Sequence, residues 1–112
     1  MWNRLMGGGG GASANITPHQ LAQALGQPDP PVVVDVRSPQ EYASGHIPQA
    51  RLIPLPDLGG RLGELPKDRP VVCVCRSGAR SAQATALLAR SGYRVQNMSG
   101  GMLGWRGPVA RG

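Results

Sequence analysis

The residues best suited to nucleophilic chemistry lie together in one short segment, CRSGARS at positions 75–81. Cys75 can react as a thiolate, and the permanent cations Arg76 and Arg80 favour that thiolate and attract an anionic substrate. Gly78 lets the backbone of such a loop curl close to the sulfur, because it carries no Cβ. The segment therefore predicts a cysteine nucleophile that acts on a small oxyanion.

The segments on either side predict how this loop is positioned. The apolar run 71–74 precedes it as a strand, and the Ala- and Leu-rich run 82–89 follows it as a helix, which Ser81 is expected to cap. Backbone N–H groups at a helix start, together with the helix dipole, favour an anion. We therefore expect Cys75 at the carboxyl end of a strand, where parallel α/β sheets bind ligands.

The rest of the chain alternates strands with helices. Helices are expected to begin at Thr17 and Ser38, because each is followed by proline and by a capping-box residue, Gln20 or Glu41. Apolar runs predict strands over 32–36 and 52–53, an irregular helix over 57–65 and a half-buried strand over 93–98. This alternation predicts a parallel α/β sheet covered by helices on both faces.

The length of 112 residues predicts one small domain. Glycines fill positions 7–11, so we expect a flexible Gly-rich leader at 1–13, a domain at 14–107 and a loose C-terminal tail at 108–112. No apolar run approaches the ~20 residues of a membrane span. Residues 1–6 lack the apolar core of a secretory signal. We therefore expect no membrane partner.

The formal net charge of +6 comes almost wholly from arginine, since Lys67 is the only lysine. The arginines are scattered, without a tight basic run or interleaved aromatic residues, so we expect no nucleic-acid partner. The positive field can still steer an anionic substrate. Two cysteines do not make a disulfide framework, and a reducing compartment, the cytoplasm, is the simpler expectation.

Three motifs together resemble the single-domain rhodanese-like sulfurtransferases over residues 14–107. They are DVRSPQEY at 35–42 with GHIPQA at 45–50, the loop CRSGARS at 75–81, and GGMLGW at 100–105. All three occur in the order and at the spacing of that family. The resemblance implies a rhodanese-like α/β fold, with a five-stranded, mainly parallel sheet flanked by helices on both faces.

The same resemblance implies a double-displacement reaction. Cys75 attacks the outer sulfur of thiosulfate or of a persulfide donor, and a Cys75 persulfide remains when sulfite leaves. Cyanide or a thiol, such as that of thioredoxin or glutathione, then takes the sulfur, and no metal or organic cofactor is implied. Backbone N–H groups and side chains of the loop can hold the persulfide and the sulfonate, so the candidate substrate-binding residues are Arg76, Ser77, Gly78, Ala79, Arg80 and Ser81.

Two other functions are open at this point. A sulfur-relay module would take its sulfur from a partner protein, for which the cationic surface and the glycine leader are suited. A phosphatase or an arsenate reductase would use the same cysteine. Tyrosine phosphatases and the dual-specificity phosphatases with a rhodanese fold have a Cys-x5-Arg loop, however, whereas Arg80 makes this loop Cys-x4-Arg. The shorter loop suits a single sulfur atom in the cradle, which favours sulfur transfer.

Several other residues near these motifs are expected to be structural. Asp35 and Arg37 are expected to pair with each other, with the backbone near the loop or with Glu41. Cys73 lies within the strand and is expected to pack in the core, with a resolving role as the alternative. His46 is expected to lie in a turn rather than act as a base, and Trp105 is expected to cover the core.

Overall fold

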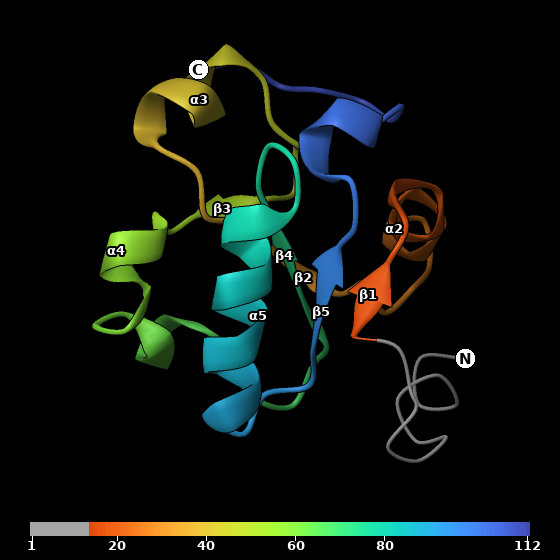
Figure 1. Cartoon of the computed structure of the whole chain (residues 1–112). Coiled ribbons are helices and arrows are strands. Elements are labelled where there is room, and N and C mark those ends of the chain that lie inside the picture. The colour runs from red at the N-terminus through yellow and green to blue at the C-terminus, as the bar shows by residue number, and fades with distance from the viewer. Residues whose placement is uncertain (1–13) are drawn as a thin grey trace.

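Five parallel strands form one sheet in the computed structural model, which describes residues 14–112. The predicted leader, 1–13, lies outside the described residues. The order of the strands in the sheet is β1-β5-β4-β2-β3 (Figure 1). Their bounds are Asn15–Ile16 (β1), Val32–Asp35 (β2), Arg51–Leu52 (β3), Val71–Val74 (β4) and Val95–Met98 (β5). The predicted five-stranded parallel sheet is confirmed.

Local sequence signals account for the helices. Both predicted capping boxes are present, Thr17 with Gln20 at the start of α2 and Ser38 with Glu41 at the start of α3. The irregular helix expected over 57–65 is divided into the short helix α4 and the 3-10 turn η1, which the glycines between them separate. The bounds are Pro18–Leu25 (α2), Pro39–Ser44 (α3), Leu55–Leu58 (α4), Leu62–Glu64 (η1), Ala79–Arg90 (α5) and Gly101–Gly104 (η2).

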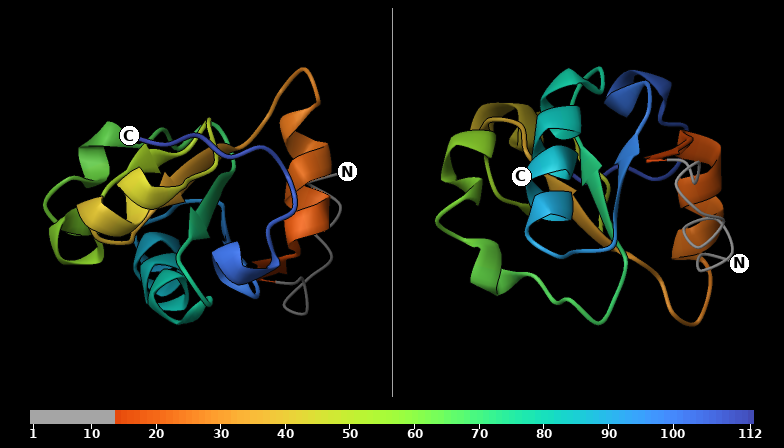
Figure 2. Two further views of the ribbon diagram at one scale, coloured as in Figure 1. Left: turned by 90° about the horizontal axis from the view of Figure 1, so that it is seen from above. Right: turned by 60° about the horizontal axis from the view of Figure 1, so that its bottom comes forward.

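The core has two parts, one on each face of the sheet. Alternate residues of β4 divide between them, because successive side chains of a strand point to opposite faces. Val71 and Cys73 pack under α5 and α4, whereas Val72 and Val74 pack with Leu21 of α2 on the other face. Figure 2 shows α5 and α2 on opposite sides of the strands. Trp105 packs against the second part, as expected.

Strand β5 is buried throughout, whereas its alternating sequence predicts a half-buried strand. Both faces of the sheet are covered at β5, since Val95 packs in the part of the core under α5 and Met98 in the part under α2, so the polar side chains Gln96 and Asn97 are enclosed as well. The side chain of Gln96 donates a hydrogen bond to the carbonyl oxygen of Asn15 at 3.1 Å. Polar residues in this strand therefore bond to neighbouring segments instead of to solvent.

The C-terminal segment is held against α3, although the sequence predicts a loose tail at 108–112. His46 and Ala110 form an isolated antiparallel bridge, and the Gly112 N–H donates to the carbonyl oxygen of Ala43 at 2.9 Å. The C-terminus accordingly lies beside α3 in Figure 1. In residues 14–112, no helix is long and apolar enough to cross a membrane.

Candidate active site

Cys75 directly follows β4, at the edge of the sheet where the carboxyl ends of the parallel strands meet. It is 1% exposed and belongs to the part of the core under α5. The N–H groups of Met102 and Leu103 in η2 donate to the carbonyl oxygens of Cys75 and Arg76, at 2.9 and 3.1 Å. The position of the cysteine is therefore fixed both by β4, which it follows, and by η2, which is distant in the sequence.

The sulfur of Cys75 lies within reach of several hydrogen-bond donors. The Gly78 N–H donates to Sγ at 3.0 Å, and the Ser81 hydroxyl lies 3.2 Å from it. Burial by itself raises the pKa of the Cys75 thiol, but the Ser81 hydroxyl and the backbone N–H groups of residues 81, 78 and 77 outweigh it and leave the pKa lowered. A lowered pKa increases the fraction of reactive thiolate at neutral pH.

The cap of helix α5 is Gly78, and the expectation that Ser81 caps it is wrong. Gly78 has a left-handed φ of +106°, which turns the chain sharply from the loop into the helix at Ala79. Because α5 begins two residues before Ser81, that side chain lies inside the first turn, buried and facing Cys75. Ser81 thus contributes its hydroxyl to the sulfur and not to a backbone N–H.

Asn97 of β5 is a site residue that sequence reasoning did not assign. Its Oδ1 lies 2.5 Å from the Ser81 hydroxyl, whose single proton can be donated either to this oxygen or to Cys75 Sγ, and its Nδ2 donates to the carbonyl oxygen of Gly78 at 3.1 Å. These contacts hold the start of α5, from Gly78 to Ser81, against β5. They follow from the parallel pairing of β5 with β4, in which Asn97 lies opposite Cys73 and therefore close to the start of the loop.

Gly101 allows η2 to approach the loop at a distance that no side chain would permit. A Cβ at this position would lie 2.3 Å from the carbonyl oxygen of Arg76 and 2.6 Å from that of Cys75. The residue also has a left-handed φ of +60°. The Gly-Gly pair at 100–101 is the only sequence signal of this approach, and it does not indicate which segment comes close.

The two arginines of the loop have different surroundings. Arg76 is exposed, and within residues 14–112 its side chain has no hydrogen-bonding or acidic partner. Arg80, in contrast, forms a bidentate ion pair with Glu41 of α3, with Nη1–Oε1 at 2.7 Å and Nη2–Oε2 at 2.8 Å. The structure therefore places Arg80 against a carboxylate, whereas the sequence predicts both arginines as substrate-binding residues.

Asp35 and Arg37 form a buried pair at the end of β2. The Arg37 guanidinium donates to both carboxylate oxygens of Asp35, at 2.7 to 3.1 Å, and also to the carbonyl oxygen of Gly45 at 2.8 Å. Asp35 and Arg37 were expected to pair with each other, with the backbone near the loop or with Glu41, and in the structure they pair with each other. Their contacts join β2 to the end of α3, which carries Glu41.

Cys73 and His46 are both enclosed by structural contacts. Cys73 is fully buried, and this burial raises the pKa of its thiol to about 12, so it stays protonated. The ring of His46 stacks on Tyr42, with centroids 3.6 Å apart, and its Nδ1 lies 2.7 Å from the Tyr42 carbonyl oxygen. Neither residue forms a hydrogen bond to Cys75 among the described contacts.

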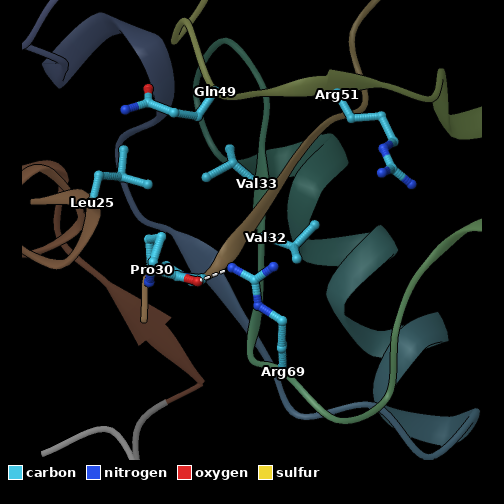
Figure 3. Close-up of a pocket in the computed structure, with 8 residues that line it drawn as sticks. Leu25, Pro30, Val32, Val33, Gln49, Arg51 and Arg69 are labelled. Atoms are coloured by element: carbon cyan, nitrogen blue, oxygen red, sulfur yellow. Dashed lines mark hydrogen bonds between the residues drawn. The ribbon is translucent and has the colours of Figure 1, made fainter. Parts of the chain in front are cut away.

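A hollow of about 240 Å³ lies at the other end of the sheet. Its lining includes Leu25, Val32 and Arg69, and Figure 3 shows the Arg69 guanidinium directed at the carbonyl oxygen of Pro30. Val32 begins β2 and Arg69 precedes β4, so this hollow belongs to the amino ends of the strands and lies apart from Cys75. Across residues 14–112, no group of His, Cys, Asp or Glu is placed to hold a metal ion.

We expect Ser81→Ala to raise the pKa of the Cys75 thiol, because it removes a hydroxyl donor to the thiolate. The rate of thiolate alkylation by iodoacetamide should then rise at higher pH than in the parent protein, and at pH 7 it should be lower by on the order of tenfold. Ser77→Ala is the matched control, because the Ser77 side chain is exposed and only its backbone acts on the sulfur. Equal profiles for the two variants would contradict this assignment.

Comparison with known proteins covers both the sheet and the loop. The family model of the rhodanese-like domain matches residues 17–108. A sulfurtransferase of Allochromatium vinosum is 46% identical over 91 residues, 80% of this chain and 85% of the relative. The putative sulfurtransferase YtwF of Bacillus subtilis is 40% identical over 75 residues, 67% of this chain and 73% of the relative. A solved rhodanese-like domain protein of Staphylococcus aureus has a TM-score of 0.83 and 33% identity, covering 88% of this chain and 97% of that one.

Proposed function

The chain belongs to the rhodanese-like domain family, and we propose that it moves the outer sulfur of thiosulfate, or of a persulfide, to a thiol or cyanide acceptor. The relatives named as sulfurtransferases support sulfur transfer in general. The observation that carries the finer proposal is the Cys75 sulfur, buried at a strand end and held by the Gly78 N–H and the Ser81 hydroxyl.

In the first step, the Cys75 thiolate attacks the outer sulfur of thiosulfate. The S–S bond of the donor breaks, its electron pair leaves with sulfite, and the persulfide anion of Cys75 forms. Backbone N–H groups of residues 77, 78 and 81, together with the Ser81 hydroxyl, are arranged to stabilise that anion. The uncompensated guanidinium of Arg76 attracts the sulfonate of the donor.

In the second step, an acceptor attacks the outer sulfur of the persulfide. The thiolate of glutathione or thioredoxin becomes a persulfide, or cyanide becomes thiocyanate, and the Cys75 thiolate is restored. The chain's own groups suffice for both steps, since no proton has to be taken from the nucleophile once it is a thiolate. Because the cycle requires a reduced cysteine, we place it in the cytoplasm.

The test is a panel of donors followed by intact mass measurement of the protein. Thiosulfate, mercaptopyruvate and glutathione persulfide are each added, and the protein is weighed before and after addition of cyanide. We expect thiosulfate and glutathione persulfide to add one sulfur atom, which cyanide removes as thiocyanate. The absence of a one-sulfur adduct with every donor would contradict the proposal.

A sulfur-relay module is the second candidate, and one surface feature favours it. Leu103 is 65% exposed and lies directly beside the loop, because its N–H donates to the carbonyl oxygen of Arg76. An apolar side chain next to a free cation is suited to contact with a partner protein that brings its own persulfide. Sulfur transfer from a protein persulfide that is slowed by Leu103→Ser, with an unchanged rate from thiosulfate, would support the relay.

A further inference from the structure

The carboxylate of Glu41 is held in a fixed position by two elements. Its Oε1 accepts from the backbone N–H of Ser38 at 3.0 Å, as the closing residue of the α3 capping box. Oε1 and Oε2 also accept from the guanidinium of Arg80, at 2.7 and 2.8 Å. Glu41 therefore joins α3 to the first turn of α5, directly after the loop of Cys75.

The Glu41–Arg80 pair stays charged across the physiological pH range. The hydrogen bonds from Arg80 and from the backbone of Ser38 lower the pKa of Glu41 to about 2, and the partnership with Glu41 raises the pKa of Arg80. The two side chains are 31% and 38% exposed, so solvent screens but does not remove the charges. Arg80 is in the first turn of α5, next to Ser81, whose hydroxyl lies 3.2 Å from the sulfur of Cys75, so this cation is close to the reacting group.

The pair changes the charge that a donor meets at the loop. Two arginines flank Cys75 in the sequence, but the carboxylate of Glu41 compensates the guanidinium of Arg80. Arg76 is then the loop cation with no acidic partner in the described part of the chain. A donor with two negative charges, such as thiosulfate, loses part of its attraction, whereas a persulfide with no other charge loses little.

We infer that Glu41 determines donor specificity by neutralising Arg80, so that the site favours persulfides without a sulfonate over dianionic thiosulfate. This inference rests on the proposed sulfur transfer through Cys75. Glu41 acts through Arg80 and touches neither the donor nor the sulfur, so its role is that of a positioning residue. It also replaces the expectation that both arginines of the loop hold the sulfonate.

The substitution Glu41→Gln tests the inference without removing the helix cap. Gln20 closes the equivalent capping box of α2 with its Oε1 at 3.0 Å from the Thr17 N–H, so glutamine is compatible with this geometry. Single-turnover formation of the Cys75 persulfide is measured with thiosulfate and with 2-hydroxyethyl hydropersulfide. In the latter reaction the thiolate attacks the outer sulfur and 2-mercaptoethanol leaves. We expect the ratio of the thiosulfate rate to the hydropersulfide rate to rise about fivefold, the size of one partly screened charge interaction.

Glu64→Gln is the matched control. Glu64 forms the same kind of bidentate pair with Arg61, at 2.7 and 3.0 Å, on the exposed turn η1. The substitution changes the net charge by the same amount, away from the loop, and should leave the ratio unchanged. The gain in Glu41→Gln should also diminish as ionic strength increases, since added salt screens the interaction of Arg80 with the donor.

Arg80→Gln and the double variant Glu41→Gln/Arg80→Gln complete the test. Arg80→Gln leaves the carboxylate of Glu41 uncompensated and should lower the ratio about fivefold, and the double variant should return it to within about twofold of the parent value. If Arg80 holds the sulfonate despite its pairing, the double variant will lose thiosulfate reactivity as fully as Arg80→Gln, and the inference is wrong. An unchanged ratio in Glu41→Gln would also overturn it. Failure of the parent protein to form any persulfide would instead contradict the proposed function.

Discussion

Cys75→Ser is expected to abolish sulfur transfer, with a loss of at least about 10⁴-fold in thiosulfate:cyanide turnover, because a serine hydroxyl cannot form the persulfide. Every donor aimed at this position, from the Gly78 N–H to the Ser81 hydroxyl, remains in the variant. The loss of turnover therefore measures the contribution of the sulfur atom itself, separately from that of the hydrogen-bond donors around it. Intact mass after incubation with thiosulfate should show no added sulfur atom.

Cys73→Ser is the control for this experiment. It removes the other free thiol, which lies on the same strand and packs in the same part of the core. Because the pKa of Cys73 is about 12 and its side chain is fully buried, we expect the variant to form the one-sulfur adduct at a rate within about threefold of the parent. If Cys75→Ser retained turnover, or if the adduct required Cys73, Cys75 would not be the residue that carries the transferred sulfur.

Gly101→Ala is expected to have the second largest effect, because the new methyl group would overlap the backbone of the loop. Its Cβ would lie 2.3 Å from the carbonyl oxygen of Arg76, and neither backbone can move without breaking the bonds from η2 to the loop. We expect unfolding free energy to fall by about 3 kcal/mol, from overpacking and a left-handed alanine. Persulfide formation should slow by about 100-fold as Cys75 moves from its donors. Urea unfolding and single-turnover kinetics measure the two effects.

Gly100→Ala separates the overlap from the backbone conformation. Gly100 also has a left-handed φ, +78°, but a Cβ there would meet no atom within 4 Å. The variant should lose about 1 kcal/mol of stability and keep persulfide formation within about threefold of the parent. If both variants reacted at the parent rate, the contact between η2 and the loop would have no part in positioning Cys75.

Local order along the chain accounts for the part of the fold that sequence reasoning predicted. Thr17-Pro18 and Ser38-Pro39 mark helix starts through bonds that span three residues, and the structure forms both capping boxes. The run 71–74 is apolar at every position because β4 is covered on both faces. These features depend on neighbouring residues alone, so their residue types suffice to predict them.

Predictions were wrong where burial or the start of an element depends on distant segments. The strand predicted over 93–98 was expected to be half-buried, but residues of α5 cover one face of it and residues of α2 cover the other. Ser81 was expected to cap a helix, but Gly78 takes the cap because its left-handed backbone starts the helix earlier. In each case the residue types were compatible with both outcomes, and packing selected one.

The sequence alone determined which groups are available at the candidate site: one cysteine, two arginines, and the small residues that let a loop close around a sulfur. Only the tertiary structure decided how these groups are shared. Arg80 pairs with Glu41, 39 residues away, Ser81 with Asn97, 16 residues away, and Gly101 lies against the Arg76 carbonyl. The physical reason is that the residue type fixes the charge and the hydrogen-bond donors of a side chain, but not the partner that it meets. That partner depends on the order of the parallel strands, which brings α3, β5 and η2 to the same end of β4.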